Sequence, residues 1–229
     1  VKVPGKQSSG EMDLEAMLEA ITAKTKIIWL CNPNNPTGTY LPQSLIRAFI
    51  KKVPTDVLVI SDEAYQEYVT DEAISTSLPL LETLSNIIVM RTFSKAYGLA
   101  GLRIGYAIIP TTVSRAFDIV RPPFNTSTIA QKAAIVALED QAFIEHSVAV
   151  NQEELAKWET FLEAKQLPYY HSQANFIFFD VKQDSKALAQ QLMQRGFIVR
   201  AGLRPEWLRI TIGHAADNQA IRTILEELL

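Results

Sequence analysis

Short apolar runs alternate with polar stretches along the first half of the chain. Four of these runs are long enough for β-strands, and they cover residues 27–30, 57–60, 87–90 and 104–109. Near-continuous apolar strands are typical of a sheet that is covered on both faces. Helical spacing of apolar residues predicts helices near residues 13–21, with Asp13 as the N-cap, and near residues 42–52. The first half of the chain therefore predicts an α/β layered domain.

The pattern changes in the second half of the chain. Residues 127–166 carry apolar positions at helical spacing, over a length sufficient to bridge two domains. Short strands are expected beyond this segment, at residues 175–181, 197–200 and 208–212. They surround an expected helix at residues 185–195, and a last helix is expected after an Asp217 cap. A small C-terminal α+β domain is therefore predicted, with domains at residues 1–147 and 148–229.

Composition narrows the class of protein. The 229 residues are 48% hydrophobic, which allows a sizeable core. The 22 basic and 25 acidic residues are interspersed, so neither nucleic acid nor a membrane surface is an expected partner. The single cysteine, Cys31, cannot form an internal disulfide, and the start VKVPGKQSSG lacks the apolar core of a signal peptide, so a cytoplasmic location is expected.

Neither Cys31 nor the scattered histidines have metal-ligand spacing, so no metal is predicted. The tryptophans at positions 29, 158 and 207 are predicted to be packing residues. Because the chain starts with Val1 and leads straight into a helix, we expect it to be a piece of something longer.

Three of the apolar runs lead directly into polar clusters, CNPNNPTG, SDEAY and RTFSK. Ligands of open α/β sheets bind at the carboxyl ends of the strands, where these clusters lie. Taken singly, each cluster also fits a structural role, as a turn, a helix cap or a solubilising lysine. Their order on successive strand ends favours a shared pocket. That pocket is predicted to contain Asn35, Asp62, Tyr65 and Lys95.

The ordered motifs NPNNPTG, DEAYQEY, RTFSKAYGLAGLRIGY, RPPFN and LRITIG resemble those of fold-type I, class II aminotransferases, which depend on pyridoxal phosphate (PLP). The resemblance is closest to histidinol-phosphate aminotransferases and extends from about Asp13 to Leu229. The glycines after the lysine motif lack dinucleotide-binding spacing, so a Rossmann domain is not expected. The resemblance implies a partial large domain with a mostly parallel sheet flanked by helices, a small C-terminal domain, and a homodimer.

The resemblance also assigns roles around the cofactor ring. Lys95 would carry PLP as a Schiff base and later shuttle a proton. Asp62 would pair with the pyridine nitrogen, so that the ring can accept electrons. Tyr65 and Asn35 would donate hydrogen bonds to the ring phenolate oxygen, and Asn35 would also contact the substrate. Catalysis is therefore expected to depend on Lys95, Asp62 and Tyr65.

The resemblance assigns a second set of residues to bind the anionic groups of the cofactor and the substrate. Thr92, Ser94 and Arg103 match the family's contacts to the cofactor phosphate. Arg209 matches the arginine that binds the substrate α-carboxylate through two hydrogen bonds, and the alternative is a surface or interdomain salt bridge. Arg200 resembles a second arginine that faces the distal anionic group of the substrate.

The reaction implied by the resemblance is amino-group transfer from an amino donor to a 2-oxo acid such as 2-oxoglutarate. Alternatives on the same scaffold are aromatic transamination, a β-lyase reaction and phosphothreonine decarboxylation. Two further alternatives are a PLP-sensing module and an inactive truncated fragment. Full-length members have a segment before the first motif that supplies a helix N-terminus to the phosphate, so this chain alone is expected to bind PLP more weakly.

Overall fold

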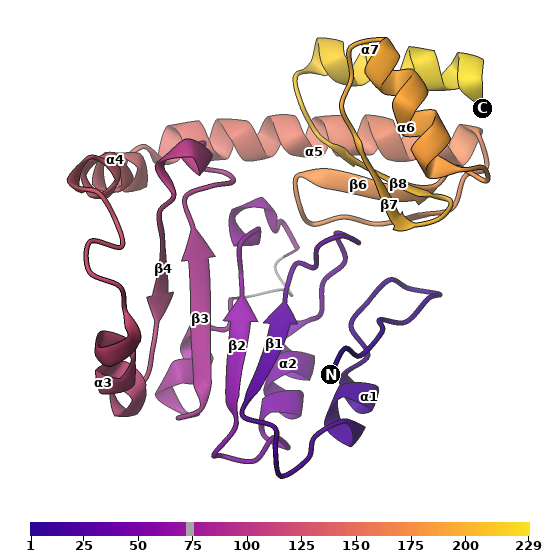
Figure 1. Cartoon of the computed structure of the whole chain (residues 1–229). Coiled ribbons are helices and arrows are strands. Elements are labelled where there is room, and N and C mark those ends of the chain that lie inside the picture. Colours follow the sequence, from indigo (N-terminus) through magenta and orange to yellow (C-terminus); the bar gives the residue numbers. More distant parts are fainter. Residues whose placement is uncertain (72–75) are drawn as a thin grey trace.

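The computed structural model describes residues 1–71 and 76–229. Within them, the strands form two four-stranded sheets, which we call sheet A and sheet B (Figure 1). Sheet A has the order β1-β2-β3-β4, and sheet B has the order β5-β6-β8-β7. The strands are β1 (Ile27–Cys31), β2 (Leu58–Asp62), β3 (Ile87–Thr92), β4 (Gly105–Ile108), β5 (Tyr169–Tyr170), β6 (Phe176–Asp180), β7 (Arg200–Arg204) and β8 (Trp207–Thr211).

Helices pack around both sheets. The α-helices are α1 (Leu14–Glu19), α2 (Gln43–Ile50), α3 (Thr111–Val120), α4 (Thr128–Glu139), α5 (Gln141–Ala164), α6 (Ser185–Gln194) and α7 (Ala215–Leu228). Three short 3₁₀ helices connect the strands of sheet A, namely η1 (Gln66–Tyr68), η2 (Leu78–Glu82) and η3 (Ala100–Leu102). The Asp13 side chain accepts a hydrogen bond from Ala16 N at 3.1 Å, so the predicted cap of α1 is confirmed.

Sheet A is parallel from β1 to β3, and β4 runs antiparallel to β3. One face packs against α1 and α2 in a core that includes Leu30, Val59 and Ile87. The expectation that both faces are covered holds for β2 and β3 but is wrong for the edge strands. In β1, Ile27 is 58% exposed and Trp29 is 51% exposed, and β4 is also largely exposed.

The expected helix at residues 127–166 is two helices, which meet at Asp140. This residue caps α5 by accepting a hydrogen bond from Phe143 N at 3.1 Å. The strand expected at residues 197–200 instead begins at Arg200, because pairing with β8 starts there. The predicted cap Asp217 lies inside the first turn of α7, and His214 occupies the cap position.

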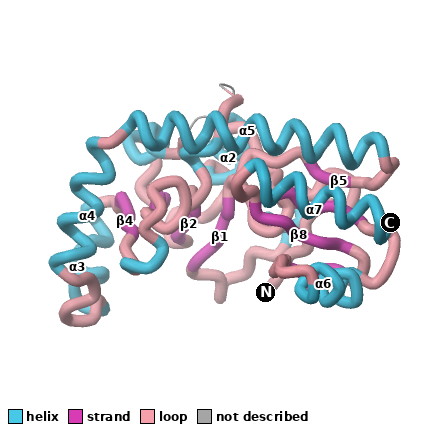
Figure 2. Tube along the Cα trace, turned by 90° about the horizontal axis from the view of Figure 1, so that it is seen from above, coloured by secondary structure: helices cyan, strands magenta, loops and turns pink. Residues whose placement is uncertain are grey.

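Helix α5 joins the two sheets (Figures 1 and 2). Near its N-terminus, Ile144 lies in an apolar cluster with Tyr65 and Phe176, above the carboxyl edge of sheet A. Towards its C-terminus, Trp158 and Leu162 are buried in the core of sheet B, together with residues from α6 and α7. One continuous helix therefore spans the two cores.

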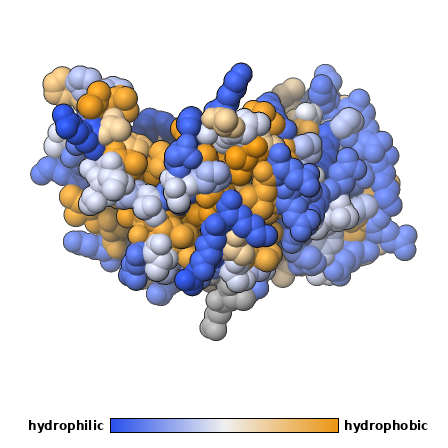
Figure 3. All heavy atoms as spheres, turned by 90° about the horizontal axis from the view of Figure 1, so that it is seen from below, coloured by the Kyte–Doolittle hydropathy of each residue, from blue (hydrophilic) through white to orange (hydrophobic). Residues whose placement is uncertain are grey.

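Several large apolar side chains lie on the surface. Ile119 on α3, Phe124 in the following loop and Ile129 on α4 are strongly exposed. Apolar areas also interrupt the hydrophilic surface seen from below in Figure 3. No helix in the two described ranges combines the length and the apolar character needed to cross a bilayer.

Candidate functional site

The predicted site residues follow the strands of sheet A. Asn35 lies in the loop after β1, Asp62 ends β2, and Lys95 lies in the turn after β3. Because these strands are parallel, all three positions fall at one edge of the sheet. Sheet B lies beyond this edge in Figure 1, so the candidate site is at the junction of the two sheets.

The loop after β1 is held by its own side chains. Asn32 donates from Nδ2 to the Leu41 carbonyl at 2.9 Å and accepts from Leu41 N at 2.7 Å. Gly38 has a φ of +78°, and a Cβ there would lie 2.3 Å from Ser172 Oγ, so only glycine fits. Gln173 N donates to the Gly38 carbonyl at 2.8 Å. The loop that carries Asn35 is therefore fixed against the segment before β6.

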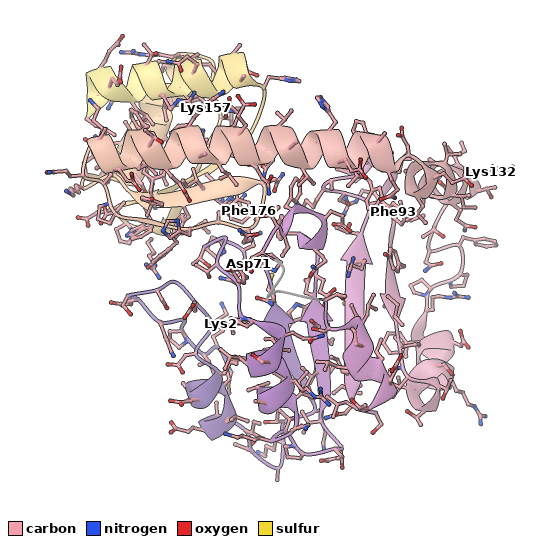
Figure 4. The ribbon with its side chains drawn as sticks, turned by 180° about the vertical axis from the view of Figure 1, so that it is seen from behind. Lys2, Asp71, Phe93, Lys132, Lys157 and Phe176 are labelled. Carbon is pink, nitrogen blue, oxygen red and sulfur yellow. The ribbon has the colours of Figure 1, made fainter. Side chains whose placement is uncertain are left out.

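Asn35 connects the two sheets through its side chain. Its Nδ2 donates to the Tyr65 hydroxyl at 3.2 Å, and its Oδ1 accepts from Arg209 Nη1 at 2.6 Å. The Arg209 guanidinium lies 4.8 Å from the ring centroid of Phe176, which also packs edge-on against Tyr65 at 5.3 Å. Figure 4 shows Phe176 between the ends of the two sheets. These contacts bring Arg209, on β8, to the carboxyl edge of sheet A.

Burial shifts the pKa values of Tyr65 and Arg209. Burial raises the pKa of the Tyr65 phenol, while the Arg209 charge and the Asn35 hydrogen bond act in the opposite direction. Burial lowers the pKa of Arg209, with opposition from Tyr65 and a further lowering from Arg200. The buried Arg209 Nε has no hydrogen-bond partner among the described residues. An anionic ligand at this position would satisfy that donor.

Lys95 reaches the same place from β3. Its Nζ lies 5.4 Å from the Tyr65 ring centroid, and it forms no salt bridge with any residue in the described ranges. Its carbonyl accepts from Gly98 N at 2.9 Å, in a turn where Gly98 has a φ of +69°. The structure therefore brings together Lys95, Tyr65, Asn35 and Arg209.

The residues predicted to bind the cofactor phosphate and the distal group of the substrate have fewer contacts with the rest of the candidate site. Thr92 Oγ1 accepts from Ser94 N at 3.1 Å, which turns the chain just before Lys95. Arg103 is exposed, and its Nη1 donates to the Ala100 carbonyl at 2.8 Å. Arg200 is exposed on β7, opposite Arg209 in the strand register. Neither arginine makes a hydrogen bond to the group around Tyr65.

Asp62 has a partner that the sequence did not indicate. Its Oδ1 accepts from Ala64 N at 3.2 Å, and its Oδ2 accepts from Trp29 Nε1 at 3.2 Å. The interpretation of Trp29 as a packing residue is wrong, because half of its surface is exposed, whereas Trp158 is fully buried as expected. The alternation of side chains along a strand could have indicated the contact between Trp29 and Asp62. Trp29 lies two positions before Cys31, which is opposite Asp62 in the register.

A buried ion pair beneath the site was also missed. Arg91 contacts Glu63 Oε2 through Nη2 at 2.7 Å and through Nε at 2.9 Å. Glu63 also accepts hydrogen bonds from Thr76 Oγ1 at 2.7 Å and from Ser77 N at 2.5 Å. The motifs could have indicated this pair, because Glu63 and Arg91 are opposite charges shortly after the apolar runs 57–60 and 87–90, at the ends of two adjacent parallel strands. This network joins the carboxyl ends of β2 and β3.

An open groove of about 1180 Å³ runs between β1 and the N-terminal stretch. Trp29, Cys31 and Asn35 line its side next to the candidate site, while Lys95, Tyr65 and Asp62 do not line it. The groove therefore borders the site without containing its centre.

We expect the Cys31 thiol to react slowly in the folded protein. Burial raises its pKa to about 11, and the nearby Asp62 charge adds to the effect. Because unfolding restores the ordinary value near 9.0, unfolded chains release the thiol proton at lower pH, and stability falls with rising pH between 9.0 and 11. The pH dependence of alkylation measures this pKa with and without urea. A native midpoint at or below 9.0 would contradict the expectation.

Comparison with known proteins agrees with this arrangement. The family model described as aminotransferase class I and II matches residues 1–228. A histidinol-phosphate aminotransferase of Geobacillus thermodenitrificans is 49% identical over 96% of the chain, and that of Bacillus subtilis strain 168 is 48% identical over 96%. The chain spans 61% and 62% of the lengths of these two relatives.

Solved structures give the same picture. The histidinol-phosphate aminotransferase of Sinorhizobium meliloti in complex with pyridoxal-5'-phosphate matches with a TM-score of 0.88 and 32% identity, over 99% of this chain and 63% of that one. An L-threonine-O-3-phosphate decarboxylase of Porphyromonas gingivalis matches with a TM-score of 0.77 and 25% identity, over 92% of this chain and 66% of that one. With a family match along almost its whole length, the chain belongs to the aminotransferase class I and II family.

Proposed function

We propose that this chain is the part of a PLP-dependent aminotransferase that holds the cofactor and transfers an amino group to a 2-oxo acid such as 2-oxoglutarate. Histidinol phosphate is the first candidate donor, because the relatives from Geobacillus and Bacillus are histidinol-phosphate aminotransferases. The observation that carries the proposal is the position of Lys95 Nζ beside Tyr65, where Asn35 donates a hydrogen bond to Tyr65 and accepts one from Arg209.

The residues at the carboxyl edge of sheet A fit PLP in their chemistry. Asp62 supplies a carboxylate for a protonated ring nitrogen, and Tyr65 and Asn35 supply donors for a ring oxygen. Thr92 and Ser94 supply hydroxyls for a phosphate. Arg103, an exposed residue of the connection between β3 and β4, would supply the positive charge. The unpaired Arg209 Nε adds a donor for an anionic substrate group.

When bound, PLP supplies an electron-accepting ring that stabilises negative charge on the carbon next to the transferred amine. Lys95 Nζ would hold the cofactor covalently, and as a free amine it would move the proton at that carbon. Asp62 keeps a positive charge favourable at the ring nitrogen through its carboxylate. Tyr65 and Asn35 would hold the ring oxygen by hydrogen bonds.

The two arginines of sheet B are proposed to select the substrate. Arg209 binds the α-carboxylate, a planar task for which its paired donors are suited. Its contact with Asn35 holds the guanidinium at the junction of the sheets before substrate arrives. Arg200 lies opposite Arg209 on the neighbouring strand and is proposed to face the distal anionic group.

The organisation of the protein is part of the same proposal. We place the domain boundary near residue 147, within α5, so that residues 1–147 form the partial large domain and residues 148–229 form the small one. A homodimer and a cytoplasmic location are also proposed. Ile144 lies in the apolar cluster with Tyr65, while Trp158 lies in the core of sheet B, which supports a boundary within α5.

A decarboxylase reaction on an O-phosphorylated amino acid is the second candidate. The similarity to the Porphyromonas gingivalis L-threonine-O-3-phosphate decarboxylase supports it. A panel of amino donors separates the two candidates, because transamination converts a 2-oxo acid to an amino acid, while decarboxylation releases carbon dioxide.

Covalent labelling tests the cofactor site directly. The chain is incubated with PLP and reduced with borohydride, and the labelled peptide is mapped by mass spectrometry. We expect label on Lys95 and its loss in Lys95→Arg. Lys132→Arg is the matched control, because this exposed lysine lies on α4, away from the site in Figure 4, and should not affect labelling. Label spread over surface lysines, with none enriched at Lys95, would overturn the proposal.

A further inference from the structure

The Asp62 carboxylate receives hydrogen bonds from two different elements. Ala64 N, on the chain that follows β2, donates to Oδ1 at 3.2 Å. Trp29 Nε1, on the neighbouring strand β1, donates to Oδ2 at 3.2 Å. We propose that Trp29 is a positioning residue that fixes the plane of the Asp62 carboxylate. The inference deepens the proposed function and rests on it, since Asp62 is the residue proposed to pair with the cofactor ring.

Two donors are needed because of how a carboxylate rotates. The last torsion of aspartate is broad, so one hydrogen bond leaves the carboxylate plane free to turn. A second donor on the other oxygen removes this freedom. The indole of Trp29 suits the task, because it is rigid and its single polar atom is a donor only. Each carboxylate oxygen still has a lone pair free to accept a hydrogen bond from a ligand.

Packing alone does not explain Trp29. Its side chain is 51% exposed, and Ile27, two positions earlier on the same face of β1, is 58% exposed. An exposed aliphatic residue would serve the strand equally well at position 29. What distinguishes the tryptophan from Ile27 is the N–H group directed at Asp62. The strand register explains the reach, since Trp29 pairs with Ile60, which is two residues before Asp62 on the same face of the sheet.

The first test needs no cofactor. The three tryptophans give three indole N–H resonances, which Trp29→Phe, Trp158→Phe and Trp207→Phe assign one at a time. We expect Asp62→Asn and Asp62→Ala to shift the Trp29 resonance and to leave those of Trp158 and Trp207 in place. An unchanged Trp29 resonance in both variants would overturn the proposal.

The second test measures PLP affinity. Trp29→Phe keeps a ring at this position and removes the N–H, and we expect it to weaken PLP binding about threefold to tenfold. Trp207→Phe is the matched control and should bind PLP as the unmodified chain does. In the Asp62→Asn background, Trp29→Phe should cause no further loss, because its effect acts through the carboxylate. An equal loss in both backgrounds would indicate a merely structural role and contradict the proposal.

The two tests separate this inference from the proposed function. If neither the unmodified chain nor Trp207→Phe binds PLP, the proposed function fails for this chain. The indole resonances then decide the role of Trp29 by themselves. Thermal unfolding midpoints of all variants identify any that lose their fold.

Discussion

Glu63→Gln is expected to lower the free energy of unfolding by about 3–5 kcal/mol, the usual cost of removing one partner of a buried ion pair. Glu63 is 2% exposed, so its charge is compensated by neighbouring protein groups. Arg91 provides two of these contacts, and Thr76 and Ser77 provide the others. Among the carboxylates in the described ranges, Arg91 would then be left with the more distant Glu67, at 3.6 Å.

Urea unfolding measures this loss. The matched control is Asp56→Asn, which removes one partner of the exposed pair between Lys26 and Asp56 and should leave stability nearly unchanged. If Glu63→Gln unfolds at the same urea concentration as the control, the pair is not a stabilising contact. A double substitution with Arg91→Leu should recover part of the loss, because the unpaired charge is removed.

The ion pair also bears on the candidate site. Glu63 follows Asp62 directly, and Arg91 directly precedes Thr92. A loss of the pair therefore loosens the chain on which Asp62 and the turn to Lys95 depend. We expect Glu63→Gln to lower the fraction of PLP label found on Lys95 as well as the stability.

Trp158→Ala is expected to destabilise the protein by about 3–5 kcal/mol, as large aromatic deletions in cores do. Trp158 is fully buried and packs edge-on against Phe161 at 5.8 Å. The Arg222 guanidinium lies 5.4 Å from its ring centroid, and Trp158 Nε1 donates to Asn218 Oδ1 at 3.4 Å. The substitution would leave a cavity between α5 and α7 that rigid neighbours cannot fill.

Denaturant unfolding with two probes tests this expectation. Circular dichroism follows the whole chain, and hydrogen exchange follows the strands of sheet B. Phe143→Ala is the matched control, because it lies on the same helix with half of its side chain exposed and should cost little. Equal destabilisation by the two substitutions would show that the core around Trp158 does not hold the C-terminal half together.

The strands that carry the site were predictable, because they are short apolar runs that end in polar motifs. The start of β7 was not. Phe197 and Val199 have strong strand propensity, but pairing with β8 begins at Arg200, and pairing decides where a strand starts. Helix α3 was also missed, since its β-branched residues, such as Thr111 and Val113, favour strands locally. The burial of the edge strands β1 and β4 depends on which elements pack against them. The apolar pattern within a strand carries no information about those elements.

The same limit applies to the site. Motif order predicted that Asn35, Asp62, Tyr65 and Lys95 would share one edge of the sheet. The side-chain partners depend on strand register and on the placement of sheet B. Arg209 reaches Asn35 from 174 positions along the sequence, so no local signal describes the contact.

The close approach at Gly38 has a consequence for motion between the two sheets. With no room for a Cβ beside Ser172, and with a hydrogen bond from Gln173, the loop after β1 and the segment before β6 are in contact at a fixed point. Sheet B can therefore rotate about this point more easily than it can slide past it. Arg209 lies away from this point on β8, so a small rotation would move its guanidinium relative to Lys95 and would stretch or break its hydrogen bond to Asn35.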